Sequence, residues 1–461
     1  MILWNEIKHS MSAHLGSCVS EDGAQLTYEQ MCVFAERFAE RLNERAYAIL
    51  CRSEMASAMA MLACIAAGRT AIPIPVRYGK ELYTRILERV APPAVITDVC
   101  GELTVISTRD PKPFSDAESS AAVILFTSGS TGKPKGVMLS EKNLLSNARD
   151  ISAYIGITDK DRILISRPLY HASVLSGEFI AGLLCGADIV FSSQAFSPIA
   201  LLQIIRERNI SVMGTTPTLA AAMARFSHRG GPHSLRKLSI SGERVNESVA
   251  RTIRAGFPNT EIWCGYGLSE ASPRVAYLPC SLFDTVPTCA GIALPSVDIR
   301  IVDGELRDVK RGRSGQVLVK GEGVMLGYFR DSERSARTVR NGWLCTGDIG
   351  FIGEDGMLYI KGRADDMIFR AGMNIYPAEI EGALCSDERV DELLVYGYDD
   401  GETQSIGIRV RGRFGSTDEV ARLCAQRLPS YQMPSKIELT DEFEMGVSGK
   451  KKRYTEGSEA A

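Results

Sequence analysis

Apolar side chains recur along the first half of the chain, first at helical spacing and then in short runs. Residues 26–42 show the spacing of one helix face, and Thr27 stands where an N-cap is expected. The pattern predicts further helices at 55–67 and 81–90 and strands at 46–51, 70–75 and 94–97. Alternating strands and helices indicate a parallel sheet with helices on its faces.

The same alternation resumes after residue 139. Ser140 is placed to cap a helix that Gly156 ends. Helices are also expected at 177–185 and from Ser197-Pro198 onwards, and strands at 162–166, 187–191, 211–214 and 237–241. These elements predict a second, doubly wound α/β unit.

The pattern changes near residue 285. Short alternating strands are expected at 297–302, 316–320 and 357–361, with turn signals at Asp303-Gly304 and Asp355-Gly356. A charged α+β segment follows Arg363. The predicted fold class is therefore α/β: two doubly wound subdomains, a small β-barrel-like subdomain and a small α+β C-terminal domain.

Composition limits the classes of function. A chain of 461 residues, 45% hydrophobic and 24% charged, has the make-up of a globular protein with more than one domain. The net charge of -3 argues against nucleic acid or an anionic membrane as the main partner. No apolar stretch reaches membrane-spanning length, so a cytoplasmic location is expected. The 12 cysteines lack CxxC spacing and are interpreted as free thiols rather than zinc ligands.

A run of glycines, hydroxyls and lysines at 127–136 is the clearest chemical signal. Backbone N–H groups in such a loop form an anion-binding concavity, and the lysines suit phosphate. Pro134 follows Gly132-Lys133, which excludes a Walker A loop because the next residues cannot open a helix. The run is predicted to join two strands and to cradle a polyphosphate; a flexible surface turn is the alternative.

Four further motifs are each weak alone. Tyr266 lies between two glycines and could stack on a base, and Glu270 could hold Mg²⁺. Asp348 follows a Gly-rich turn and could accept the hydroxyls of a ribose. The others are KGRADD at 361–366 and SGK at 448–450.

Taken in order, these motifs resemble the adenylate-forming superfamily of acyl-CoA synthetases, adenylation domains and luciferases. The resemblance runs from about residue 26 to Lys450. It implies that a carboxylate attacks the α-phosphate of ATP to give an acyl-adenylate, and that a thiol then displaces AMP. The thiol would belong to CoA or to a carrier protein.

The resemblance also implies roles for individual residues. Lys450 would offset charge during adenylation, Glu270 would bind Mg²⁺, and Asp348 and Arg363 would hold the ribose. Tyr266 would stack on adenine beside Gly242 and Glu243, with Gly267 and Ser269 near the phosphates. The β- and γ-phosphates would be held by Thr127, Ser128, Gly129, Ser130, Thr131, Gly132 and Lys133.

The resemblance places a hinge at Asp365, with neighbouring Asp366 as an alternative. It divides the chain into a large domain, 1–364, and a small mobile domain, 365–461. Rotation would withdraw Lys450 and bring the loop at Gly372 to the thiol tunnel. Proline is missing before Gly449-Lys450, so Lys451 is a competing candidate for the catalytic lysine.

The acid is predicted to lack an α-amino group. The resemblance places His171 beside the acyl pocket as a catalytic candidate, with Ser173, Thr216 and Gly265 as further lining residues. No aspartate that could pair an ammonium occurs between Arg167 and Gly177. The short chain slightly favours a carrier protein over CoA. A luciferase-like oxidase and a noncatalytic nucleotide-binding protein are the alternative functions.

Overall fold

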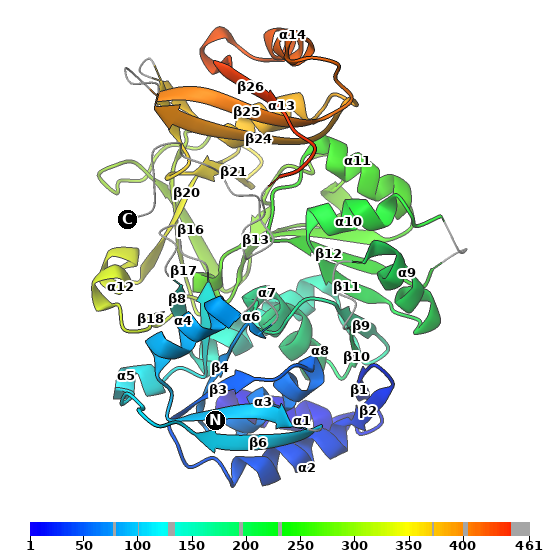
Figure 1. Cartoon of the computed structure of the whole chain (residues 1–461), viewed down its shortest axis with the longest axis vertical. Coiled ribbons are helices and arrows are strands. Elements are labelled where there is room, and N and C mark those ends of the chain that lie inside the picture. Colours follow the sequence, from blue (N-terminus) through cyan, green and yellow to red (C-terminus); the bar gives the residue numbers. More distant parts are fainter. Residues whose placement is uncertain are drawn as a thin grey trace.

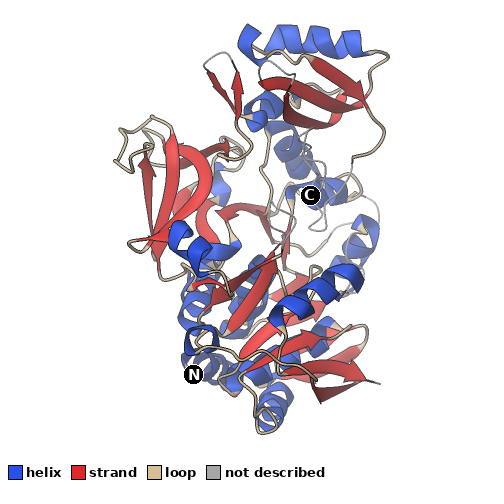
Figure 2. Ribbon diagram, turned by 60° about the vertical axis from the view of Figure 1, so that its left-hand side comes forward, coloured by secondary structure: helices blue, strands red, loops and turns tan. Residues whose placement is uncertain are grey.

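The computed structural model describes residues 1–76, 80–99, 101–127, 134–192, 197–228, 233–370, 373–399 and 404–443. Two large sheets with helices form the lower body of the molecule, and a β-rich unit and a smaller α+β unit complete it (Figures 1 and 2). No helix within the described ranges is long and apolar enough to cross a membrane.

The first large sheet has seven strands and is parallel at its centre. Its order is β18 (Gly327–Tyr328), β8 (Lys135–Leu139), β7 (Val123–Thr127), β4 (Thr70–Pro73), β3 (Ala46–Leu50), β5 (Ala94–Val99) and β6 (Glu102–Ser107). The helices of this part of the chain are α1 (Ile2–Ala13), α2 (Tyr28–Ala39), α3 (Glu54–Ala66), α4 (Lys80–Val90) and α5 (Asp116–Ser119). The predicted helices and strands are confirmed here, with small shifts at their ends. Thr27 caps α2 by accepting from the Gln30 N–H.

The second large sheet has nine strands. Its order is β15 (Ile292–Ala293), β14 (Arg274–Leu278), β13 (Glu261–Gly267), β12 (Lys237–Ser241), β11 (Val212–Thr215), β9 (Arg162–Ile165), β10 (Asp188–Phe191), β1 (Cys18–Glu21) and β2 (Ala24–Thr27). Its longer helices are α6 (Glu141–Ile155), α9 (Pro198–Glu207), α10 (Pro217–Ala224) and α11 (Glu247–Gly256).

The buried helix expected at 177–185 is confirmed, but it begins earlier than predicted and is not α-helical throughout. Helical structure begins at α7 (Ala172–Val174), continues as a π-helical segment over Leu175–Ile180 and ends as α8 (Ala181–Leu184). The apolar pattern locates buried helix but does not distinguish a π-helical turn, which depends on tertiary packing.

The two α/β units are not contiguous in sequence. β1 pairs in parallel with β10, so residues near the N-terminus join the second sheet. β18 pairs with β8 and extends the first sheet with residues from beyond the second. One buried core contains side chains of both units, including Tyr28, Leu62 and Phe179.

The β-rich unit is a five-stranded sheet. It contains β16 (Val297–Val302), β17 (Gly315–Gly321), β20 (Trp343–Ile352), β19 (Val339–Arg340) and β21 (Leu358–Arg363), together with α12 (Ser332–Thr338). The turn expected around Asp348 is wrong, because Asp348 lies inside the ten-residue strand β20. Gly347 has a φ of 74° within that strand, which explains the turn-like composition.

The remaining elements form a separate core at the top of Figure 1. They are β22 (Ile368–Arg370), β23 (Met373–Ile375), α13 (Pro377–Leu384), β24 (Val390–Asp399), β25 (Gln404–Gly412), α14 (Thr417–Arg427) and β26 (Lys436–Leu439). This core draws its buried apolar side chains from residues after Arg363. The precise domain boundary at 364/365 stays a prediction.

Candidate active site

The glycine-rich run joins two strands, as predicted. β7 and β8 are antiparallel neighbours, and Thr127 stands opposite Lys135 in their register. The Thr127 Oγ1 atom is buried and has no hydrogen-bond partner within the described part of the chain. A buried hydroxyl without a partner is available to a ligand. Ser128, Gly129, Ser130, Thr131, Gly132 and Lys133 lie outside the described residues.

Glu270 is held by two side chains that the sequence did not associate with it. Lys135 Nζ lies 2.8 Å from Glu270 Oε1, and the Tyr328 hydroxyl donates to the same oxygen at 2.7 Å. Glu270 is 7% exposed. Burial alone would raise the pKa of Glu270, but Lys135 and the hydrogen bonds outweigh it and the pKa is lowered. The carboxylate is therefore ionised at neutral pH.

This carboxylate suits the Mg²⁺ that accompanies a nucleotide. Mg²⁺ binds through one or two carboxylates together with phosphates and water rather than in an all-protein cage. Among the described residues there is no cluster of three or more His, Cys, Asp or Glu side chains that could form such a cage. Glu270 is ionised, and only its Oε1 atom has a recorded side-chain partner in the described ranges. The residues present therefore fit a Mg²⁺ ion that would be bound by Glu270 together with the phosphates of a nucleotide.

Tyr266, Asp348 and Arg363 form a second group of contacts. The Tyr266 hydroxyl donates to Asp348 Oδ2 at 2.5 Å, and Arg363 Nη1 donates to Asp348 Oδ1 at 3.2 Å. Asp348 and Arg363 face each other in the register of β20 and β21. Burial and the neighbouring Asp348 carboxylate raise the pKa of Tyr266 well above its usual value, so its hydroxyl stays protonated.

The structure brings these two groups together at the end of β13. Tyr266 is in the last two residues of that strand, and Glu270 lies in the short helical turn Ser269–Ala271 that follows. Gly267 is required there, because a β-carbon at this position would lie 1.9 Å from the Pro273 carbonyl oxygen. One short stretch of chain thus carries both the aromatic ring and the carboxylate.

The other predicted nucleotide residues lie at the neighbouring strand end. Gly242 directly follows β12 and has a φ of 93°. Glu243 accepts a hydrogen bond from the Thr218 hydroxyl at 2.6 Å. A β-carbon at Gly242 would be 3.9 Å from the Thr216 methyl group, so Thr216 lies beside this strand end. Asp365, the predicted hinge residue, has its Oδ2 atom 3.9 Å from Arg363 Nη2.

The predicted acyl-pocket residues come from separate elements. His171 is the N-cap residue of α7, with its ring centroid 4.5 Å from that of Tyr170, and Ser173 lies within α7. Thr216 caps α10 and Gly265 lies in β13. Their roles as lining residues stay predictions. Gly372, Lys450 and Lys451 lie outside the described residues.

Sequence reasoning missed several functional candidates. Lys135 belongs to the glycine-rich run, which was a usable signal, although the role in phosphate binding was given to Lys133. Tyr328 stands in no motif that sequence spacing could reveal, because its contact with Glu270 joins residues far apart in sequence. The buried charged residues Arg167, Glu178 and Arg274 are not among the predicted site residues either.

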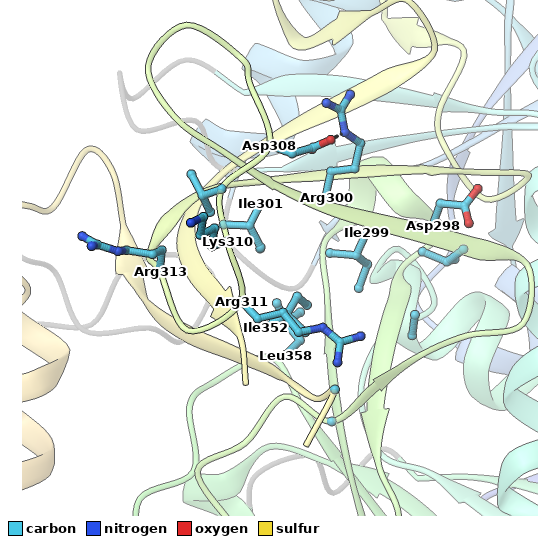
Figure 3. A pocket seen from close by; sticks show the side chains of 15 residues that line it. Asp298, Ile299, Arg300, Ile301, Asp308, Lys310, Arg311, Arg313, Ile352 and Leu358 are labelled. Atoms are coloured by element: carbon cyan, nitrogen blue, oxygen red, sulfur yellow. Dashed lines mark hydrogen bonds and ion pairs between the residues drawn. The ribbon is translucent and has the colours of Figure 1, made fainter. Parts of the chain in front are cut away.

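A pocket of about 550 Å³ lies elsewhere, in the β-rich unit (Figure 3). Arg300, Lys310, Arg311 and Arg313 lie around an aliphatic floor that includes Ile299 and Leu358. None of the predicted site residues lines it. It is separate from the contacts at the end of β13.

Comparisons with known proteins identify the family of the chain. A family model described as AMP-binding enzyme matches residues 10–329. Feruloyl-CoA synthase of an Amycolatopsis species is 28% identical over 478 residues, which cover 97% of this chain and 96% of that protein. A Bacillus subtilis (strain 168) protein with the name acyl-CoA synthetase YngI is 32% identical over 71% of this chain, which spans 61% of that relative's length.

A solved structure supports the fold. O-succinylbenzoate coenzyme A synthetase (MenE) from Bacillus subtilis, in complex with ATP and magnesium ion, matches with a TM-score of 0.82 at 25% identity, over 96% of this chain and 98% of that chain. The predicted fold class and the resemblance to adenylate-forming enzymes are thereby confirmed. The chain belongs to the AMP-binding enzyme family.

Proposed function

We propose that this protein joins a carboxylic acid to a thiol in two steps. ATP first activates the acid as acyl-AMP with release of pyrophosphate, and the acyl group then passes to the thiol. The observation that carries this proposal is the convergence of two anion-handling groups at the end of β13: Glu270 with Lys135, and Asp348 with Tyr266. The proposed reaction cleaves ATP between the α- and β-phosphates, so the enzyme must hold both the ribose and the β- and γ-phosphates.

Asp348 and Arg363 would position the ribose. Arg363 also donates to the Thr346 carbonyl at 2.7 Å, which holds the guanidinium in place against β20. Tyr266 orients the Asp348 carboxylate through one of its oxygens. A carboxylate oriented in this way can accept both ribose hydroxyls, and such positioning favours in-line attack.

Glu270 and the loop that begins at Thr127 would hold the phosphates. Bound Mg²⁺ would offset the negative charge of the triphosphate, with Glu270 as its protein ligand. Lys135 keeps Glu270 ionised and adds positive charge beside the same strand pair. Lys450 is the proposed source of positive charge on the acid side, and His171 a proposed contact of the acyl group.

We infer that CoA is the thiol substrate. Both curated relatives described above are named for an acyl-CoA product, and the matched structure is an O-succinylbenzoate coenzyme A synthetase. Feruloyl and O-succinylbenzoyl groups carry no α-amino group, which agrees with the acid predicted here. ATP and CoA as substrates support a cytoplasmic location. The small domain, 365–461, would rotate between the two steps. The rotation would withdraw Lys450 from the site and bring the loop at Gly372 to it.

The test is a screen of ATP–pyrophosphate exchange across acids with and without an α-amino group. Exchange driven by acids that lack the amino group is expected, followed by thioester formation when CoA is added. Exchange driven best by an amino acid would contradict the proposal. Lys450→Ala should abolish exchange and Lys451→Ala should not; the reverse result would move the adenylation role to Lys451.

A further inference from the structure

A buried charged cluster lies against β13, the strand that ends at the candidate nucleotide site. It consists of Arg167, Glu178 and Arg274, which are 9%, 5% and 4% exposed. Arg167 Nη2 lies 2.6 Å from Glu178 Oε1. Glu178 belongs to the π-helical segment, a type of irregularity that is frequent at functional sites.

The cluster has one positive charge in excess. Arg167 pairs with Glu178. Within the described ranges, no carboxylate lies within 4.0 Å of the Arg274 guanidinium, and that guanidinium donates no hydrogen bond. Arg274 and Glu178 interact through their charges without direct contact. A buried charge without a partner is strongly unfavourable, so Arg274 requires an anion.

Three polar atoms of the cluster also lack partners. They are Arg167 Nε, Glu178 Oε2 and Arg274 Nε. Buried polar groups normally have hydrogen-bond partners, so this concentration within the described part of the chain indicates a place that a polar group occupies.

Two glycines make room for the cluster on the nine-stranded sheet. A β-carbon at Gly265 would lie 1.3 Å from Arg274 Nη1, and one at Gly214 would lie 2.3 Å from Glu178 Oε1. Gly265 is in β13 and Gly214 in β11. The guanidinium of Arg274 therefore rests against the residue that precedes Tyr266, next to the proposed nucleotide site.

We propose that Arg274 binds a second carboxylate on the acid substrate, so that the enzyme prefers dicarboxylic acids. This inference rests on the proposed function. One carboxylate of the acid would face the α-phosphate, and the acyl chain would extend to place the other at Arg274. In this scheme Arg274 determines specificity for the acid. The Arg167–Glu178 pair is a positioning element that keeps the charged groups beside Arg274 in place.

The test compares acids in matched pairs that differ only in a distal carboxylate, in aliphatic and aryl series of several lengths. The wild-type enzyme is expected to show a higher kcat/KM for the dicarboxylic member of at least one pair. Arg274→Gln should lower the dicarboxylic-to-monocarboxylic ratio at least roughly thirtyfold, chiefly through KM for the acid, because it removes one partner of a buried charge pair. Arg274→Lys should keep part of the ratio.

Arg254→Gln is the matched control. Arg254 is a partly buried arginine that pairs with Asp284 at 2.8 Å and touches no member of the cluster. This variant should leave the ratio unchanged. Loss of activity on both members of a pair to the same degree in Arg274→Gln would show a purely structural role and overturn the proposal, as would a wild-type preference for the monocarboxylic members.

A binding measurement separates this proposal from the proposed function. Nonreactive acyl-sulfamoyl adenosines of a matched pair are titrated into the wild-type enzyme by calorimetry. Tighter binding of the distal carboxylate form supports the charge site even if no acid is turned over, whereas equal binding overturns it. If no acid of any class drives pyrophosphate exchange, the proposed function fails independently.

Discussion

At the scale of single residues, each carboxylate in the candidate site depends on partner side chains from other elements. Glu270 depends on Lys135, and Asp348 depends on Tyr266 and Arg363. Lys135 keeps the buried Glu270 carboxylate ionised, and the hydrogen bonds from Tyr266 and Arg363 orient the buried Asp348 carboxylate. The chemistry of the site is therefore sensitive to substitutions outside the recognised motifs.

Lys135→Met is expected to destabilise the protein by about 1–3 kcal/mol at pH 7, because it leaves the buried Glu270 carboxylate without one of its hydrogen-bond donors. The pKa of Glu270 is lowered in the folded state, so its contribution to stability is present above the usual value of 4.5 and is lost as pH falls through the lowered pKa. The difference between wild type and variant should shrink in that acidic range, as measured by urea unfolding.

Lys142→Met is the control for this prediction. Lys142 pairs with Glu322 at 2.8 Å, but both side chains are at least half exposed. Such a pair contributes little, so stability should hardly change. If both lysine variants lose the same stability at pH 7, the special role of the Lys135–Glu270 pair is refuted.

Tyr266→Phe is expected to raise KM for ATP roughly tenfold, because a hydrogen bond to a charged group contributes about 1.5–3 kcal/mol. Tyr359→Phe removes a comparable tyrosine–aspartate bond, from Tyr359 to Asp355 at 2.7 Å, in an exposed turn outside the site. Steady-state kinetics at varied ATP should show the change for Tyr266 alone. A similar KM in both variants would remove Tyr266 from the nucleotide site.

At the scale of elements, the ends of helices and strands place the site. Ser140 caps α6 by accepting from the Asn143 N–H, and Gly156 ends the helix at a φ of 68°. β7 and β8 form the hairpin that carries the glycine-rich run. These local features could be predicted, because capping and turn chemistry depend on neighbouring residues. The π-helical segment that carries Glu178 could not, because its register depends on packing against the sheet.

Ser140→Ala is expected to lower the free energy of unfolding by about 1 kcal/mol, since a capping box is lost from a helix with a buried face. Ser115→Ala removes the same kind of capping box from α5, a four-residue helix without buried residues. Fraying of α5 should leave global stability nearly unchanged. Chemical denaturation of both variants makes the comparison, and equal losses would contradict this account of α6.

At the scale of the whole molecule, an ionic contact connects the C-terminal unit to the β-rich unit. Lys361 on β21 lies 3.1 Å from Glu379 on α13. The two side chains of the Lys361–Glu379 pair are about one-third exposed. A pair of this kind is weak enough to break during the proposed domain rotation.

Glu379→Gln is expected to change the equilibrium constant between the two arrangements of the units by a factor of about two to five. This factor corresponds to the roughly 0.5–1 kcal/mol that such a pair contributes. Fluorescence energy transfer between labels on the two units would measure the shift, and added salt should produce the same shift in the wild type. Lys436→Ala, which removes the Lys436–Glu438 pair within the C-terminal unit, is the control. If the label distance responds to neither Glu379→Gln nor salt, this pair does not hold the arrangement.

The sequence by itself determined the helices with clear caps, the central strands, the strand–loop–strand context of the glycine-rich run and the family. Each of these depends on residues close together in the chain or on short motifs in a recognisable order. The tertiary structure alone decided that β1 joins β10, that Lys135 pairs with Glu270 and that Glu178 lies against Gly214. Those contacts join residues far apart in sequence, and the partner of a buried charge is set by the path of the chain rather than by its neighbours.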